Sequence, residues 1–208
     1  MTGQPDSTVP IIILAAGLSS RMRGRDKLLE TVDGQPLLAL QIARARAATS
    51  GPVLVTLPPT PHPRYDVVDM SAAEVVTVEK PQDGMSVSLR AGLAALPQDA
   101  VAAMIALPDL PEIETDDLVR VLTAVTEQPQ AMIWRGATEA GRPGHPVVFS
   151  ARLFEDLAKI KGDQGGAAVI KDHAPETVLV PLPGERALRD LDTPEAWAAW
   201  RIARPRLT

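Results

Sequence analysis

The stretch IIILAAGLSSRMRGRDKLL, residues Ile11–Leu29, decides the fold class of this chain. Its four leading apolar residues run directly into Ala-Ala-Gly, a pattern typical of a strand that is buried on both faces and ends in a tight turn. Small polar residues and a cluster of basic residues follow the turn. We therefore expect a parallel-sheet protein whose first strand ends at a binding site for a negatively charged ligand.

Short β-branched runs alternate with longer helical patterns along the rest of the chain. Strands are predicted at 53–57, 75–78, 102–107, 131–134, 146–149 and 178–180, and helices at 36–49, 86–95, 115–126, 151–160, 166–173 and from Pro194 onward, with Thr115 and Thr193 as N-caps. Such alternation predicts a mostly parallel sheet with helices on both faces. Ligands bind beyond the carboxyl ends of such strands, so the loops after Leu14 and Leu107 are the candidate site.

Composition narrows the classes of function. The chain has 208 residues and a formal net charge of −5, which argues weakly against a general nucleic-acid binder. It contains no cysteine, which excludes disulfides, thiolate metal sites and a cysteine nucleophile. No apolar run approaches the roughly 18 residues of a membrane span, and no signal peptide is visible. We expect a cytoplasmic protein with a flexible leader at 1–9 and one domain at 10–204.

The loop after the first strand has the composition of a phosphate site. Ala15, Ala16 and Gly17 let a ligand approach the backbone, whose N–H groups can hold anionic oxygens. Positive charge follows in Arg21, Arg23, Arg25 and Lys27. Together these features suit a polyphosphate, although a glycine turn followed by a solvated basic patch would give the same pattern. Neither the Walker pattern GxxxxGK[ST] nor GxGxxG is present in this loop.

This loop resembles the signature loop of MobA-like nucleotidyltransferases, whose general form is LAAGxSxRMGxxKxL. Later stretches resemble that family in the same order: GMSVSLRAGL at 84–93, ALPDLPEI at 106–113, GRPGHPVVF at 141–149, GDQGG at 162–166 and DLDTPEAW at 190–197. The likeness covers nearly the whole chain and is closer to the branch containing molybdenum cofactor cytidylyltransferase. It implies a single-domain, three-layer α/β/α Rossmann-like nucleotidyltransferase fold.

The resemblance also implies a reaction. A nucleoside monophosphate, favoured as CMP from CTP, is transferred to a phosphate-bearing acceptor, favoured as molybdopterin, with Mg²⁺ as cofactor and pyrophosphate as the second product. CTP is favoured because Ala-Ala-Gly is the form seen in the cytidylyl branch, whereas the guanylyl branch usually has Ala-Gly-Gly. A molybdoenzyme or its insertion chaperone is the implied protein partner. Two alternatives stay open: a sugar- or alditol-phosphate nucleotidyltransferase, and a non-catalytic nucleotide-binding cofactor-insertion partner.

The chain departs from the family pattern at two places. Arg21 and Lys27 are six positions apart, one more than usual, and Arg23 has the place of an inserted residue. The residue before Asp109 is Pro108 instead of glycine, and Leu110 replaces the commoner glutamine or methionine. The first departure leaves open which arginine reaches the phosphates, and the second changes the wall beside the predicted metal.

Carboxylates after two predicted strands are the candidate metal ligands. Asp109 follows the strand at 102–107, where a carboxylate can hold Mg²⁺ over a triphosphate, although a loop aspartate can also form a turn with its own backbone. Asp190 and Asp192 precede the last helix, and alternating side chains let only one of them face the ion. We favour Asp192 slightly, although Asp192 or Thr193 could simply cap that helix.

The resemblance assigns the remaining site residues. Lys27 and Arg21 are the expected catalytic cations. The nucleotide-binding residues are expected to be Leu14, Ala15, Ala16, Gly17, Lys27, Gly84, Ser86, Ser88 and Asp109. Ser86 could equally be a plain N-cap. His145 and Asp163 are the candidates for the acceptor pocket, although each could instead order its own loop.

Overall fold

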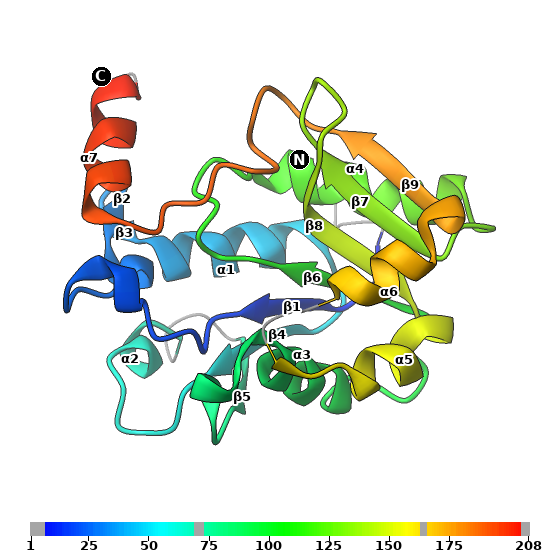
Figure 1. Cartoon of the computed structure of the whole chain (residues 1–208), viewed down its shortest axis with the longest axis horizontal. Helices are drawn as coiled ribbons and strands as arrows, with labels where there is room; N and C mark the ends of the chain where they lie inside the picture. Colours follow the sequence, from blue (N-terminus) through cyan, green and yellow to red (C-terminus); the bar gives the residue numbers. More distant parts are fainter. Residues whose placement is uncertain (1–6, 69–72, 163–165, 205–208) are drawn as a thin grey trace.

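A seven-stranded sheet organises the computed structural model, which describes residues 7–68, 73–162 and 166–204 (Figure 1). Its strand order is β5-β4-β1-β6-β8-β7-β9. The strands are β1 (Ile11–Leu14), β4 (Val53–Leu57), β5 (Glu74–Thr77), β6 (Ala102–Ala106), β7 (Ile133–Ala137), β8 (Pro143–Ser150) and β9 (Thr177–Pro181). Two short strands, β2 (Thr31–Val32) and β3 (Gln35–Pro36), form a separate hairpin.

Helices cover both faces of this sheet, as predicted. The α-helices of the described residues are α1 (Leu37–Ala48), α2 (Arg64–Val68), α3 (Met85–Ala94), α4 (Thr115–Glu127), α5 (Phe154–Lys159), α6 (Ala167–Asp172) and α7 (Pro194–Ala203), of which α7 lies at one end of the sheet (Figure 1). One hydrophobic core lies between the sheet and α1 and α4, and a second lies on the face covered by α3 and α5. Figure 1 shows these two layers above and below the strands. The predicted three-layer α/β/α arrangement is confirmed.

Parallel pairing brings the two predicted ligand loops together. β1 pairs in parallel with β4 on one side and with β6 on the other, and Ile13 is in register with Ala106. The carboxyl ends of β1 and β6 therefore lie side by side, and so do the loops that follow them. β8 is antiparallel to both of its neighbours, whereas β9 is parallel to β7, so the sheet is mostly parallel as expected.

Several local predictions were wrong in detail. The N-cap of α4 is Glu114, whose side chain forms a capping box with Asp117, so Thr115 is the first helical residue instead. The prolines after β4 lie in loop as predicted, but the short helix α2 that follows them was not predicted. The predicted helix at 151–160 is divided into a 3₁₀ turn and α5. Thr193 caps α7 as expected, because its hydroxyl accepts a hydrogen bond from the N–H of Ala196.

The domain begins earlier than residue 10. The carbonyl of Ser7 accepts hydrogen bonds from Ser50 and Thr49, and Val9 is buried. These contacts place residues 7–9 of the predicted leader against the domain, while residues 1–6 lie outside the described part of the chain. Within the described ranges, no helix has both the length and the apolar character that crossing a membrane requires.

Candidate active site

The first two residues of the loop after β1 are buried, and the next two are exposed to solvent. Ala15 and Ala16 are fully buried, and the N–H of Ala15 donates to the carbonyl of Thr56 on β4. This N–H group is therefore unavailable to a ligand. The N–H groups of Gly17 and Leu18, by contrast, donate no hydrogen bond to any residue that the structure describes. A Cβ built on Gly17 would meet nothing within 4 Å, so the fold itself does not require glycine there.

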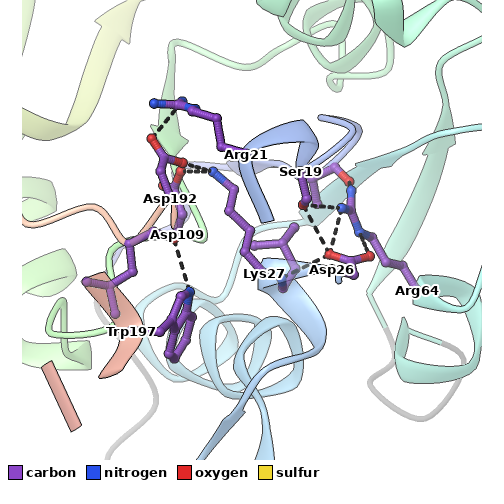
Figure 2. A network of polar contacts seen from close by, with 11 residues as sticks. Ser19, Arg21, Asp26, Lys27, Arg64, Asp109, Asp192 and Trp197 are labelled. Atoms are coloured by element: carbon purple, nitrogen blue, oxygen red, sulfur yellow. Dashed lines mark hydrogen bonds and ion pairs between the residues drawn. The ribbon is translucent and has the colours of Figure 1, made fainter. Parts of the chain in front are cut away.

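Lys27 lies between two of the predicted metal-binding carboxylates (Figure 2). Its Nζ atom is 2.5 Å from Oδ2 of Asp109 and 2.6 Å from Oδ1 of Asp192. All three side chains are only about one-sixth exposed, with values of 16%, 16% and 14%. The other oxygen of Asp109, Oδ1, is buried and has no hydrogen-bond partner among the residues described. The structure thus places an ammonium group between two carboxylates, one of which retains a free oxygen.

Backbone contacts hold the two carboxylates together. The N–H of Leu191 donates to the carbonyl of Asp109, which joins the β6 loop to the segment before α7. The indole N–H of Trp197, a fully buried residue, donates to the carbonyl of Leu191. The position of Asp192 relative to Asp109 is therefore set by backbone hydrogen bonds and by the packing of α7. Figure 2 shows Trp197 of α7 below the two carboxylates. Trp197 itself is part of the hydrophobic core.

Electrostatic interactions at this cluster favour the charged forms of Lys27 and Asp192. Burial alone would lower the pKa of Lys27, but the charge of Asp109 and hydrogen bonds to both carboxylates raise it above the ordinary value. Burial would raise the pKa of Asp192, but the hydrogen bond from Lys27 and the nearby Asp190 lower it. Burial and the neighbouring Asp192 raise the pKa of Asp190. Asp192 therefore gives up its proton more readily than Asp190.

The arginines of the predicted basic cluster are all paired with acidic residues. Arg21 lies 2.6 Å from Asp192, so it reaches the same carboxylate as Lys27. Arg23 pairs with Glu195 on α7, and Arg25 pairs with Glu30; these pairs are 2.7 and 3.2 Å long. Arg23 also has a positive φ of 54°, so the extra residue is accommodated in a tight turn. The three arginines are therefore exposed, as in the alternative of a solvated basic patch, but each has an acidic partner.

Asp190 and Asp192 differ in exposure as alternating side chains should. Asp190 is exposed, whereas Asp192 is turned inward against Lys27. Neither caps α7, because Thr193 does so.

We expect Asp192→Asn to lower turnover about 100-fold, since it removes a charge beside Lys27, and Asp190→Asn to lower it less than about 3-fold. Initial rates and the affinity for Mn²⁺ should be measured for both variants.

Thr193→Ala is the control for this comparison. It removes the helix cap and should cost about 1 kcal/mol of stability while leaving metal affinity unchanged. Equal losses of activity in Asp190→Asn and Asp192→Asn would contradict the assignment of Asp192 as the inward carboxylate.

A pocket of about 330 Å³ opens over this cluster. Six of the residues predicted to bind nucleotide line it, namely Leu14, Gly17, Lys27, Gly84, Ser88 and Asp109. Ala15, Ala16 and Ser86 do not; they are buried beneath the surface. The alternative of Ser86 as an N-cap is also wrong, because the N-cap of α3 is Gly84, with a φ of 98° that favours glycine.

A second pocket, of about 270 Å³, lies beside the first and shares Leu14, Met85 and Leu107 with it. The described residues that line it are apolar or glycine except for His145 and Arg135. Burial and the charge of Arg135 lower the pKa of His145 to about 4, so its imidazole is neutral at pH 7. Asp163, the other residue predicted to bind the acceptor, lies outside the described residues.

Two arginines at this end of the sheet were missed by sequence reasoning. Arg135 lies on β7 and lines the second pocket, and the guanidinium group of Arg64 contacts the loop after β1. Arg135 had one available signal, since it precedes the glycine-rich turn that contains His145. Arg64 had none, because it follows a run of prolines that reads as a surface loop.

The donor set at Asp109 and Asp192 fits a hard divalent cation. Carboxylate oxygens are the ligands that Mg²⁺ and Mn²⁺ prefer, and phosphates and water usually complete the shell when only one or two carboxylates are present. The unpartnered Oδ1 of Asp109 is an available ligand atom. No group of three or more acidic or histidine ligands that could hold an ion occurs within residues 7–68, 73–162 and 166–204. A protein-only metal cage is therefore absent from these ranges.

Comparison with known proteins identifies the family. A family model of the MobA-like NTP transferase domain matches residues 11–178. This chain belongs to the MobA-like NTP transferase family. It is therefore related to nucleotidyltransferases through most of its length, including the loop after β1, Asp109 and the strands that carry them. No curated protein matches the sequence significantly.

Solved structures share the whole MobA-like fold. The crystal structure of Rv0371c from Mycobacterium tuberculosis H37Rv is 25% identical, with a TM-score of 0.79 over 95% of this chain and 100% of that chain. The complex of Rv0371c with manganese is 24% identical, with a TM-score of 0.76 over the same shares. CMP:2-keto-3-deoxy-manno-octonic acid synthetase complexed with CTP is 14% identical, with a TM-score of 0.72 over 94% of this chain and 98% of that chain.

Proposed function

We propose that this MobA-like protein transfers CMP from CTP to a phosphate-bearing acceptor of the molybdopterin type and releases pyrophosphate. The observation that carries the proposal is the position of Lys27, between Asp109 and Asp192 at the floor of a pocket next to the open N–H groups of Gly17 and Leu18. Cations, carboxylates and free backbone donors at one place suit a nucleoside triphosphate with its metal.

The chain's own residues would position the reactants and neutralise charge. An oxygen of the acceptor phosphate attacks the α-phosphorus of CTP, and the bond to the β-phosphate breaks as pyrophosphate leaves. That oxygen is already anionic, so no general base is needed. Lys27 and Arg21 would stabilise the charge that accumulates on the leaving pyrophosphate. A divalent cation held by Asp109 and Asp192, Mg²⁺ by expectation, would supply polarisation of the α-phosphate.

Lys27 has to leave its carboxylates for this chemistry. In the structure its ammonium group contacts one oxygen of each carboxylate, Oδ2 of Asp109 and Oδ1 of Asp192, and leaves Oδ1 of Asp109 free. Its movement toward the phosphates would free Asp109 and Asp192 at the moment when metal and nucleotide are both present. The manganese complex of Rv0371c supports a divalent cation in a related fold, and the CTP complex of the octonic acid synthetase supports a cytidine nucleotide in the same architecture.

The second pocket supports an acceptor with a flat or apolar body and an anionic group. The described part of its lining is mainly apolar and offers few partners for the hydroxyl groups of a sugar or alditol phosphate, which would lose hydrogen bonds with water on entry. Arg135 and a neutral His145 are its only polar side chains among the described residues. A guanidinium group can bind a phosphate bidentately, so Arg135 is the proposed contact for the acceptor phosphate.

The test is a screen of nucleoside triphosphates with Mg²⁺ or Mn²⁺ and candidate acceptors, followed as pyrophosphate release. CTP should be used at least about tenfold better than GTP in direct competition, a difference of about 1.4 kcal/mol in transition-state binding. The discrimination should arise near Ala15, Ala16 and the segment 84–88 at the first pocket. Equal or better use of GTP would contradict the cytidylyl assignment, and release with none of the acceptors would leave only nucleotide binding.

A further inference from the structure

Arg64 is the most deeply buried charged side chain near the site. It is 1% exposed, although it belongs to a five-residue helix, α2, that follows a proline-rich segment. Burying a guanidinium group is costly unless hydrogen bonds replace the water it loses. Arg64 meets this condition with four side-chain hydrogen bonds, all of which go to residues 15–26 of the loop after β1.

These bonds join the two ends of the loop. Nη1 of Arg64 donates to the carbonyl of Ala15 at 2.5 Å, where β1 ends. Nε and Nη2 donate to the two oxygens of Asp26 at 2.7 and 2.8 Å, where the loop ends. Nη2 also donates to the hydroxyl of Ser19, between the two ends, at 3.1 Å. Figure 2 shows this group on the side of Lys27 opposite Asp109 and Asp192.

Asp26 connects this group to the site. Its Oδ1 accepts a hydrogen bond from the N–H of Leu28 and so caps the 3₁₀ turn η2 (Lys27–Leu29). Burial would raise the pKa of Asp26, but the hydrogen bonds and charge of Arg64 lower it, so the carboxylate remains ionised near neutral pH. The backbone from which Lys27 extends is therefore held by the Arg64–Asp26 pair.

We propose that Arg64, acting through Asp26, is a positioning residue that holds the loop after β1 and the backbone of Lys27 in the geometry that binds the triphosphate. This inference rests on the proposed function. Arg64 is not among the residues that line either pocket; its role is to keep the N–H groups of Gly17 and Leu18 and the ammonium group of Lys27 on the same side of the loop. We call the Arg64–Asp26 pair the loop clamp.

If Arg64 only stabilised the fold, its hydrogen bonds would be expected to join core elements of the sheet. A buried ion pair is weak support for a fold, since apolar residues of similar volume often stabilise as well. The guanidinium group of Arg64 donates all four of its hydrogen bonds to the loop after β1 and none to a described strand of the sheet. Displacing a catalytic group by about 1 Å can cost on the order of 100-fold in rate, so a clamp on this loop has a functional consequence.

The test uses the full chain with Arg64→Met, Arg64→Lys and Asp26→Asn. Amide hydrogen exchange of the segment 15–29, CTP affinity with Mg²⁺ and pyrophosphate release should be measured well below each melting temperature. We expect exchange in this segment to become at least tenfold faster in Arg64→Met, with unchanged exchange in β6 and α4. The kcat/KM should fall on the order of 10- to 100-fold, and Arg64→Lys, which loses the bidentate geometry, should be intermediate.

Val121→Ala is the matched control, because it removes buried volume from α4 and lowers stability without touching the loop. If Arg64→Met and Asp26→Asn differ from the wild type no more than this control does in loop exchange and CTP affinity, the loop clamp is wrong. If the wild type releases no pyrophosphate with any acceptor, the proposed function fails. The exchange and CTP measurements still decide the clamp in that case. Should Arg64→Met not fold, Asp26→Asn and Arg64→Lys supply the same comparison.

Discussion

Asp109→Asn is expected to abolish metal-dependent turnover, with a loss on the order of 1000-fold or more. Asparagine keeps the shape of the side chain but removes the charge, and it takes away one of the two carboxylates that contact Lys27. The buried Oδ1 of Asp109, which has no partner among the described residues, is the proposed ligand atom. Turnover should be measured across Mg²⁺ and Mn²⁺ concentrations, together with Mn²⁺ binding and the melting temperature.

The same loop offers a matched control in Glu112→Gln. The carboxylate of Glu112 pairs with Arg189 and accepts from the indole of Trp200, so it is an acidic group three positions away with partners outside the pocket. Its loss should affect stability more than turnover. Near-normal activity of Asp109→Asn at low metal concentration would show that the proposed metal site is wrong.

Lys27→Ala is expected to lower turnover on the order of 100-fold or more while weakening CTP binding much less. The charge of Lys27 matters most when negative charge moves to the leaving pyrophosphate, which makes the interaction stronger in the transition state than in the ground state. A second effect of this substitution, on metal binding, should be a gain instead of a loss. Because the ammonium group occupies both carboxylates in the structure, its removal should strengthen Mn²⁺ binding in the absence of nucleotide.

Lys159→Ala serves as the charge-matched control, since Lys159 is exposed on α5 and pairs only with Glu155 and Asp156 among the described residues. It should change neither turnover nor Mn²⁺ affinity. A loss below roughly 5-fold in a folded Lys27→Ala variant would assign the charge stabilisation to another cation. Weaker Mn²⁺ binding in Lys27→Ala would show that the lysine supports the ion and does not compete with it.

Much of the sheet could be predicted because its signals are local. A continuous apolar run followed by Ala-Ala-Gly predicted β1 and its loop, and the alternation of strand and helix patterns predicted two helix layers. Asp109 could be placed near that loop because parallel strands end at the same edge of a sheet. Residues 133–150 were predicted less accurately, because the strands β7 and β8 extend into a glycine- and proline-containing turn that resembles loop.

The pairing of charges could not be predicted from the spacing of the residues. Lys27 meets Asp109 across 82 positions and Asp192 across 165, and no local pattern indicates which acidic residue lies opposite which cation. The four neighbouring basic residues indicated a phosphate site, but their spacing did not show that each has a carboxylate partner. The role of Arg64 was missed for the same reason, because only the folded chain brings α2 into contact with the loop after β1.

By itself, the sequence determined the strand, the turn and the residue types at the first loop, because steric and hydrophobic preferences act over a few neighbours. It also determined, through its motifs, membership of the MobA-like family. Only the tertiary structure decided that Asp192 contacts Lys27 while Asp190 remains exposed, that Lys27 lies between two carboxylates, and that the guanidinium group of Arg64 is buried. These contacts depend on packing between distant segments, where the burial of a charge is tolerated only if a specific partner is present.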